Sequence, residues 1–128
     1  MIDNEIFVFG SNLWGHHGAG AALFAAQYYG ARGGKNSGRS GNSYAIPTKD
    51  RRFRPLLYVS IDPYVEEFLN YAAKHPELTF KVTQVGCGYA GLKPSVMSMM
   101  FEKATPNCHF DSAWKPWLGE SRTYWGTQ

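Results

Sequence analysis

The stretch EIFVFGSNLWGHHGAGAALFAA (residues 5–26) establishes the class of fold to expect. Residues 5–9 are a continuous run rich in strand-forming residues, which is typical of a buried strand. After a glycine-rich loop at 10–18, apolar residues return with the spacing of one helix face, at Ala19, Ala22, Leu23 and Ala26. A helix is therefore expected to run to about Tyr29, where Gly30 is placed to stop it.

Strands and helices continue to alternate beyond this stretch. Further strands are expected at 43–50, ending at Pro47, at 78–85, and at the short run 107–110. Strands that alternate with helices indicate an α/β protein with a mostly parallel sheet and helices on its faces. The chain has 128 residues and no evident internal repeat, so residues 1–128 are expected to form one domain.

Two more helices are expected in this alternation. The first is capped by Ser60 or Asp62, has Pro63 near its first turn, and ends at His75-Pro76. Its apolar stripe comprises Val65, Phe68, Leu69 and Ala72. The second begins at Pro94 and carries Met97, Met100, Phe101 and Ala104 on one face. The tail shows no clear period, despite its aromatic residues Trp114, Trp117, Tyr124 and Trp125.

Composition excludes several classes of protein. Hydrophobic content of 44% is that of a globular chain, and no apolar run is long enough to span a membrane. The net charge of +3 suits an anionic ligand but does not by itself argue for duplex nucleic acid. No signal peptide is apparent, so Cys87 and Cys108 are expected to be free thiols in the cytoplasm. Neither has metal-ligand spacing, so no metal and no cofactor is expected.

Two glycine-rich loops carry the main functional signal. GSNLWGHHGAGAA (10–22) and VGCGYAGLKP (85–94) each follow a strand and lead into a helix, so both should lie at the carboxyl edge of the sheet. Glycine leaves backbone N–H groups open, and a helix N-terminus favours negative charge, so the pair favours a diphosphate ligand. Neither loop matches the GxGxxG or Walker pattern, and tight helix–strand packing is the alternative interpretation.

Three residues in or near these loops have side chains suited to chemistry. The sequence places no histidine beside Cys87, which is therefore expected to pack beneath its loop rather than act as a nucleophile. Lys49 follows a strand directly and would either neutralise a phosphate or act as a catalytic amine. Asn12 would either fix a ribose hydroxyl or serve as a turn residue.

Basic residues form two groups. The polar stretch 31–43 is either a solvated connection or a flap over the ligand. The cluster RRFR (51–54) is most simply solvated surface, from which one arginine could reach a phosphate. Together with the tail aromatics they define another function class, a nucleic-acid-binding module whose affinity falls with salt. Its basic residues would be Arg32, Lys35, Arg39, Arg51, Arg52 and Arg54.

VFGSNLWGHHGAGAALFAA, SYAIPTKD and VTQVGCGYAGLK resemble, in this order, three segments of macro domains, the α/β/α family that binds ADP-ribose. The third is the most specific. It is similar to the branch that includes glycohydrolases acting on acyl-linked ADP-ribose and antitoxins that strip ADP-ribose from DNA. The sequence of these segments also resembles that of small phage-encoded macro-like proteins. The resemblance implies a three-layer α/β/α fold with a mixed, mostly parallel sheet.

The resemblance also implies a site. The diphosphate would lie between Gly18–Ala22 and Gly86–Gly91, with Tyr89 bordering the phosphates or the distal ribose. Lys49 falls on the catalytic lysine of that branch, and Asn12 would orient the distal ribose. The ligand-binding residues implied are Gly10, Ser11, Asn12, Gly18, Ala19, Gly20, Ala21, Gly86, Cys87, Gly88, Tyr89, Ala90 and Gly91.

The chain departs from the family pattern at three places. Lys93 stands where the related hydrolases commonly carry an aspartate. The usual Asp-Ile pair after the first strand is absent, which leaves Asp3 or Glu5 to contact the adenine. HHG replaces a glycine run, so His16 or His17 could add a hydrogen-bond donor or a general base.

Two functions follow from the resemblance. One is an enzyme that removes ADP-ribose from a modified protein or nucleic acid, which the presence of Lys49 favours. The other is a non-catalytic reader or sponge for ADP-ribose or a related NAD-derived signal nucleotide, which the absence of an acid at position 93 favours.

Overall fold

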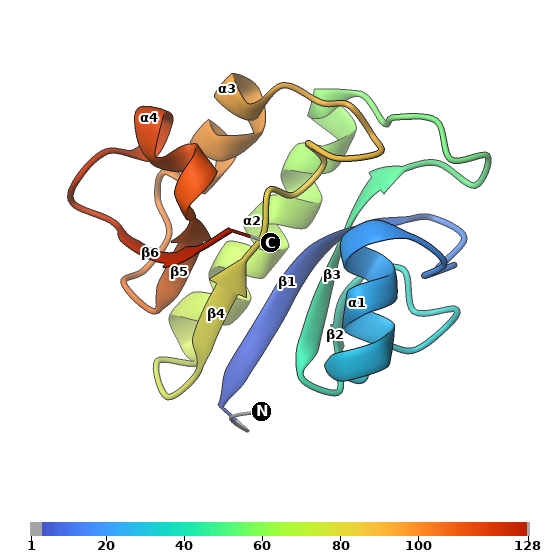
Figure 1. Cartoon of the computed structure of the whole chain (residues 1–128), viewed down its shortest axis with the longest axis horizontal. Coiled ribbons are helices and arrows are strands. Elements are labelled where there is room, and N and C mark those ends of the chain that lie inside the picture. The colour runs from blue at the N-terminus through green and yellow to red at the C-terminus, as the bar shows by residue number, and fades with distance from the viewer. Residues whose placement is uncertain (1–3, 128) are drawn as a thin grey trace.

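The computed structural model describes residues 4–127, which fold around one six-stranded sheet with the order β2-β3-β1-β4-β5-β6 (Figure 1). Only β2 runs antiparallel to its neighbour, and the other pairings are parallel. The strands are β1 (Glu5–Asn12), β2 (Gly38–Ser40), β3 (Ser43–Lys49), β4 (Thr79–Val82), β5 (Cys108–Asp111) and β6 (Thr123–Gly126). The predicted α/β class with a mixed, mostly parallel sheet is confirmed.

Helices cover both faces of the sheet and make three layers. On one face α1 (Gly20–Tyr28) packs on Phe7 and Phe9 of β1. On the other face α2 (Tyr58–Lys74) packs on Ile6 and Val8. The second face also carries the short elements α3 (Pro94–Met97), η1 (Ser98–Phe101), η2 (Ser112–Trp114) and α4 (Lys115–Leu118). β1 thus places alternate side chains in two separate cores, as its apolar run requires.

Several predicted boundaries are wrong for identifiable reasons. α2 begins at Tyr58 rather than at a Ser60 or Asp62 cap, and Pro63 lies inside it. Pro63 cannot donate to the Val59 carbonyl, but both residues are exposed, so water can satisfy that oxygen. Pro47 lies within β3 instead of ending it. Because β2 pairs only as far as Ala45, β3 is an open edge at Pro47, where a missing N–H is tolerated.

Other elements are shorter than predicted or were not predicted. The helix from Pro94 is four residues long and continues as a 3-10 turn. The strand predicted at 78–85 comprises only Thr79–Val82. β2 and β6 were missed. β6 is held by a contact distant in sequence, because the Trp125 indole donates to the Val82 carbonyl at 2.9 Å. Within residues 4–127, no helix combines the length and apolar character needed to cross a membrane.

Candidate functional site

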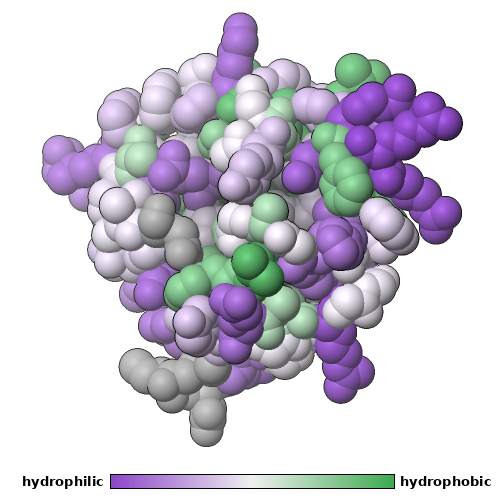
Figure 2. Space-filling model, turned by 45° about the vertical axis from the view of Figure 1, so that its right-hand side comes forward, coloured by the Kyte–Doolittle hydropathy of each residue, from purple (hydrophilic) through white to green (hydrophobic). Residues whose placement is uncertain are grey.

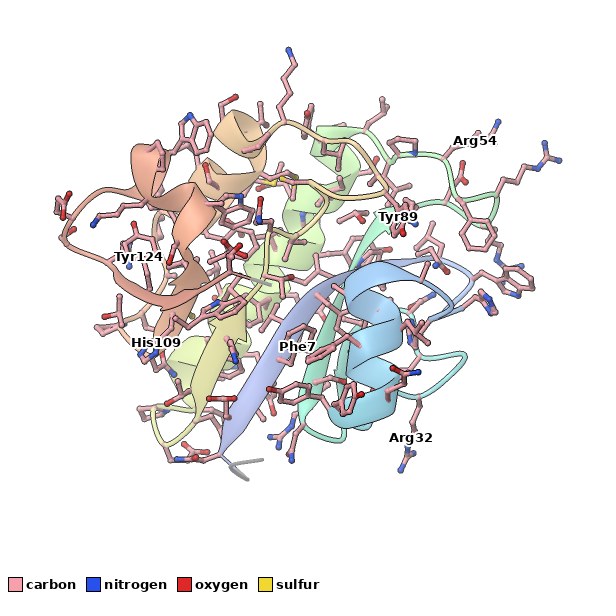
Figure 3. The ribbon with its side chains drawn as sticks, viewed as in Figure 1. Phe7, Arg32, Arg54, Tyr89, His109 and Tyr124 are labelled. Carbon is pink, nitrogen blue, oxygen red and sulfur yellow. The ribbon has the colours of Figure 1, made fainter. Side chains whose placement is uncertain are left out.

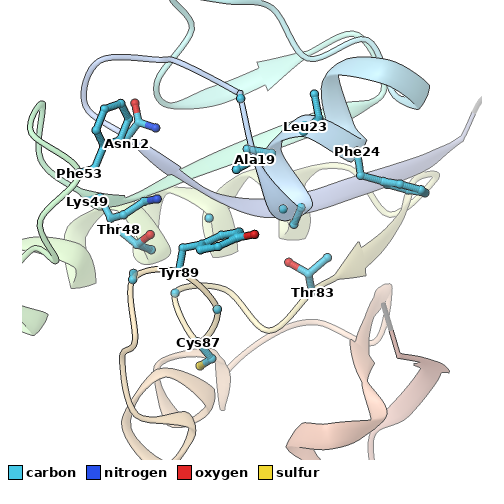
Figure 4. Close-up of a pocket in the computed structure, with 18 of the residues that line it drawn as sticks. Asn12, Ala19, Leu23, Phe24, Thr48, Lys49, Phe53, Thr83, Cys87 and Tyr89 are labelled. Carbon is cyan, nitrogen blue, oxygen red and sulfur yellow. The ribbon is translucent and has the colours of Figure 1, made fainter.

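A cleft of about 1260 Å³ opens at the carboxyl ends of the parallel strands (Figure 4). From β1 the chain passes to β3 on one side, and it later returns to β4 on the other side of β1. Ligands of open α/β sheets bind at such a switch point. The volume exceeds the roughly 300–1,000 Å³ of ordinary small-molecule pockets, so a ligand of dinucleotide size fits.

Most predicted site residues lie in this one cleft. The lining includes Gly10, Asn12, Gly18, Ala19, Gly20, Ala21, Lys49, Gly86, Cys87, Gly88, Tyr89 and Ala90. The other two, Ser11 and Gly91, are not among the lining residues. Ser11 is buried and its hydroxyl donates to the Asn36 carbonyl at 2.5 Å.

Asn12 closes the loop that follows β1. Its Nδ2 donates to the His16 carbonyl at 2.8 Å, and its Oδ1 accepts from the His16 backbone N–H at 3.1 Å. The backbone carbonyl of Asn12 accepts from Gly15 at 3.0 Å. An asparagine amide offers two donors and two acceptor positions, so one of each remains for a ligand. Asn12 therefore acts as the turn residue and still lines the cleft.

The two neighbouring histidines take different positions. His17 is buried: its Nε2 lies 2.9 Å from the Arg32 carbonyl, and its ring packs edge-on against Phe9. Burial lowers the pKa of His17, against the opposing effect of its backbone hydrogen bonds. His16 is exposed, lines the cleft and stacks on Trp14. Of the two, only His16 is placed to serve as a donor or base toward a ligand.

The first turn of α1 presents backbone N–H groups to the cleft. Ala19, at the N-cap, contributes no side-chain hydrogen bond, and the first turn holds no acidic residue. Residues 19–23 all line the cleft. The leading N–H groups of a helix have no partner within the helix, so this turn offers donors and a partial positive charge to an anion.

The second glycine-rich loop meets the first at Gly10. A methyl group placed on Gly10 would lie 3.1 Å from the backbone nitrogen of Gly86 and 3.1 Å from Oγ1 of Thr48. Gly86 itself has φ of +78°, which non-glycine residues rarely adopt. The loop then folds back through a hydrogen bond from the Leu92 N–H to the Gly86 carbonyl at 2.9 Å. The two loops therefore form one continuous wall of the cleft.

Tyr89 spans the cleft from the second loop to α1. A methyl group on Gly20 would lie only 2.8 Å from Cε2 of Tyr89, so the ring rests against the first residue of α1. Tyr89 is nevertheless 76% exposed. Figure 4 shows the ring lying in the cleft beside Lys49. The ring therefore lies over the space between the two loops, with most of its surface exposed to solvent.

Lys49 ends β3 and points between two aromatic rings. Its Nζ lies 5.6 Å from the centroid of Phe53 and 5.8 Å from the centroid of Tyr89. The negative faces of aromatic rings attract a cation at such distances. Lys49 therefore places its side-chain nitrogen between two aromatic rings that line the cleft.

Polar side chains at the carboxyl ends of β3, β4 and β5 complete the cleft floor. The hydroxyl of Thr48 donates to the Ser11 carbonyl at 3.2 Å, and that of Thr83 donates to the Val8 carbonyl at 2.7 Å. Asp111 is fully buried and accepts from Ala113 N–H at 2.9 Å and from Gln84 Nε2 at 3.3 Å. It is the one carboxylate lining the cleft among residues 4–127, and it is already engaged in hydrogen bonds.

Cys87 lines the cleft, but its environment suppresses thiolate formation. Burial raises its pKa to about 11, and the nearby Trp114 side chain opposes only part of that shift. Its sulfur lies 3.6 Å from the Val85 carbonyl and points away from Tyr89 (Figure 4). These features support packing rather than nucleophilic attack.

The Cys87 thiol is expected to alkylate slowly. At pH 8 a thiol with a pKa of about 11 is thiolate about a hundredfold less often than one with the ordinary pKa of 9.0. Its reaction with iodoacetamide should be slower by about that factor than in urea-unfolded protein, and should accelerate as the pH rises toward 11. Mass spectrometry of the alkylated peptide measures this. Equal rates in folded and unfolded protein would contradict the packed position.

Three predicted roles lie away from the cleft. Lys93 is exposed and does not line it, and its backbone N–H donates to the Tyr58 hydroxyl at 3.0 Å. Glu5 begins β1, at the opposite edge of the sheet, and accepts from the Tyr29 hydroxyl at 3.3 Å, so it cannot reach an adenine in the cleft. Asp3 lies outside the described residues. The stretch 31–43 contributes no residue to the lining, and the flap interpretation stays a prediction.

Sequence reasoning missed part of the lining. Thr48, Thr83 and Asp111 were detectable in principle, because each lies at or next to the carboxyl end of a parallel strand. Trp14 and Phe53 gave no such signal, since loop residues enter the cleft only through the folding of their loops. The same holds for the loop residue Gln84, and the α1 residues Leu23, Phe24 and Gln27 were also missed.

Comparison with protein-family models, curated proteins and solved structures gives no match to this chain.

Proposed function

We propose that this protein binds ADP-ribose or a related NAD-derived nucleotide and hydrolyses ADP-ribose from a modified protein or nucleic acid. The observation that carries the proposal is the convergence of two glycine-rich loops and Lys49 on one cleft at the switch point. In the proposed complex, the diphosphate lies between the first turn of α1 and residues 86–91, under Tyr89. The proposal places the protein in a reducing compartment such as the cytoplasm, where Cys87 and Cys108 stay as free thiols.

Lys49 has the leading chemical role in this proposal. Held between Phe53 and Tyr89, it acts as a fixed cation that stabilises negative charge developing on the leaving group or on the phosphates. His16, exposed in the same cleft, is the candidate to activate a water molecule. Asn12 keeps the His16 backbone in place through two hydrogen bonds.

A second candidate function is a reader or sponge that binds the nucleotide without cleaving it. The observation that favours it concerns the acidic groups that hydrolysis would use. Asp111 is buried and hydrogen-bonded, and Lys93 occupies the position at which related hydrolases commonly carry an aspartate. Binding needs only the backbone donors of the two loops, which are present in either case.

Two measurements separate these functions. Calorimetry against ADP-ribose, NAD, cyclic ADP-ribose and ATP tests binding, and incubation with ADP-ribosylated protein and with ADP-ribosylated DNA tests release. Binding with release supports the enzyme, and binding without release supports the reader. Dissociation constants weaker than millimolar for every nucleotide would remove both functions.

A Gly20→Val protein is expected to bind ADP-ribose about tenfold or more weakly. Gly20 has φ of +56°, where a β-branched residue is strained by about 1–3 kcal/mol, and the new side chain would displace the Tyr89 ring. Gly33→Val is the matched control, because a methyl group there meets nothing within 4 Å. Calorimetry on both variants, with circular dichroism to confirm folding, measures the effect. Equal loss in both variants would mean that the Gly20 position is not specific to the ligand.

A further inference from the structure

An exposed aromatic platform lies at one end of the cleft, on the two loops that follow β1 and β3. It consists of Trp14, His16 and Phe53. The Trp14 and His16 rings stack at 5.3 Å between centroids, and Phe53 lies 5.6 Å from Trp14 and 6.2 Å from His16. Trp14 is 55% exposed and Phe53 is 42% exposed. Their apolar faces therefore remain available to a planar partner.

The backbone beneath the platform is held by hydrogen bonds. Phe53 has φ of +63°, the one non-glycine residue with positive φ among residues 4–127. The Asp50 carboxylate accepts from the backbone N–H groups of Arg52 at 2.8 Å and Arg54 at 3.0 Å, which stabilises this turn. The two loops are also tied together, because the Leu13 N–H donates to the Lys49 carbonyl at 2.9 Å. A strained conformation that displays a large ring is a feature found at binding sites.

Positive charge is concentrated on the same loop. Residues 49–54 carry four cationic side chains and one carboxylate, whereas the whole chain has a net charge of only +3. Asp50 pairs with Arg54 at 3.0 Å, and neither Arg51 nor Arg52 forms an ion pair within residues 4–127. Figure 3 places Arg54 on the opposite side of the molecule from Tyr124. The tail aromatics therefore do not join this basic cluster, and Trp14 and Phe53 do.

We propose that the platform of Trp14, His16 and Phe53, with Arg51 and Arg52, binds single-stranded nucleic acid. Base faces stack on the rings while the arginines contact backbone phosphates, a combination that recognises single strands with little sequence preference. A duplex hides its base faces and cannot use the rings. A second copy of this chain is a poor partner for the platform, because it would bring two positively charged loops together and they would repel each other. Figure 2 shows hydrophilic side chains projecting at the upper right, next to apolar surface.

Fluorescence anisotropy with labelled twelve-nucleotide oligo-dT, oligo-U and a duplex of equal length tests this interface. Wild type is expected to bind both single strands more tightly than the duplex, with affinity that falls as salt rises. The double variant W14A/F53A is expected to lose about tenfold to a hundredfold of its single-strand affinity. R51A/R52A is expected to reduce the slope of log K against log salt by about 1.4, from about 0.7 for each lost phosphate contact.

Two controls match these changes. Trp117→Ala removes an exposed tryptophan on α4, and K74A/K103A removes two exposed lysines elsewhere on the surface. Both should bind like wild type. No binding to single strands at low salt, equal binding to the duplex, or unchanged binding by W14A/F53A would each overturn the interface. Trp14, His16 and Phe53 also line the cleft, so the nucleotide function is tested on wild type, by calorimetry with ADP-ribose. Failure of the interface and failure of the proposed nucleotide function are then distinguishable.

Discussion

A Lys49→Met protein is expected to release ADP-ribose from a modified substrate about 10²- to 10³-fold more slowly than wild type, the usual effect of removing one charge-stabilising group. Methionine keeps most of the length of the unbranched side chain but cannot supply the cation between Phe53 and Tyr89. Binding of free ADP-ribose should fall much less, because the loop N–H groups remain. Single-turnover release, followed with radiolabelled ADP-ribose, measures the rate.

Two further variants define the role of this lysine. Lys93→Met makes the same exchange outside the cleft and should leave release unchanged. Lys49→Arg keeps the positive charge, so it should retain more activity than Lys49→Met if the cation is what matters. Full activity of Lys49→Met would remove Lys49 from the mechanism. Equal inactivity of the arginine and methionine variants, with a covalent lysine adduct in mass spectra, would instead favour a nucleophile.

A Phe68→Ala protein is expected to be about 3–5 kcal/mol less stable than wild type. Phe68 belongs to the buried face of α2, and its ring contacts Tyr44 at 5.1 Å, Phe80 at 5.3 Å and Phe101 at 6.0 Å between centroids. Truncation leaves a cavity at the point where α2, β3, β4 and η1 meet. Urea denaturation followed by circular dichroism gives the free energy of unfolding.

Phe53→Ala is the matched control for this loss. It removes the same ring from an exposed position on the loop after β3, so its effect on the free energy of unfolding should be about 0.5 kcal/mol or less. Similar destabilisation by both exchanges would mean that the core on the α2 face is not where the stability resides.

Local patterns were sufficient for the main elements of the fold. The run Ile6–Phe9 predicts a strand buried on both faces, and the structure divides its side chains between two cores. The helical spacing of alanines after residue 18 predicts α1 to within about one residue. These predictions succeed because periodicity records which faces of an element must be buried.

Edge elements were beyond local reasoning. β2 has three residues and β6 has four, too few for a detectable period. Each exists because a neighbouring strand offers it hydrogen bonds, and β6 is further anchored by the Trp125 indole on Val82, 43 residues earlier. The start of α2 at Tyr58 was likewise missed, since none of its capping residues signals it.

The positions of the two glycine-rich loops and of Lys49 were available from the sequence, because parallel strands bring their carboxyl ends to one edge. Which side chains enter the cleft was decided only by tertiary contacts. Ser11 turns away to the carbonyl of Asn36, 25 residues later, while the folding of the 50–54 turn brings Phe53 to Lys49. Backbone placement follows from local pattern, whereas the direction of a loop side chain depends on partners that the sequence pattern does not identify.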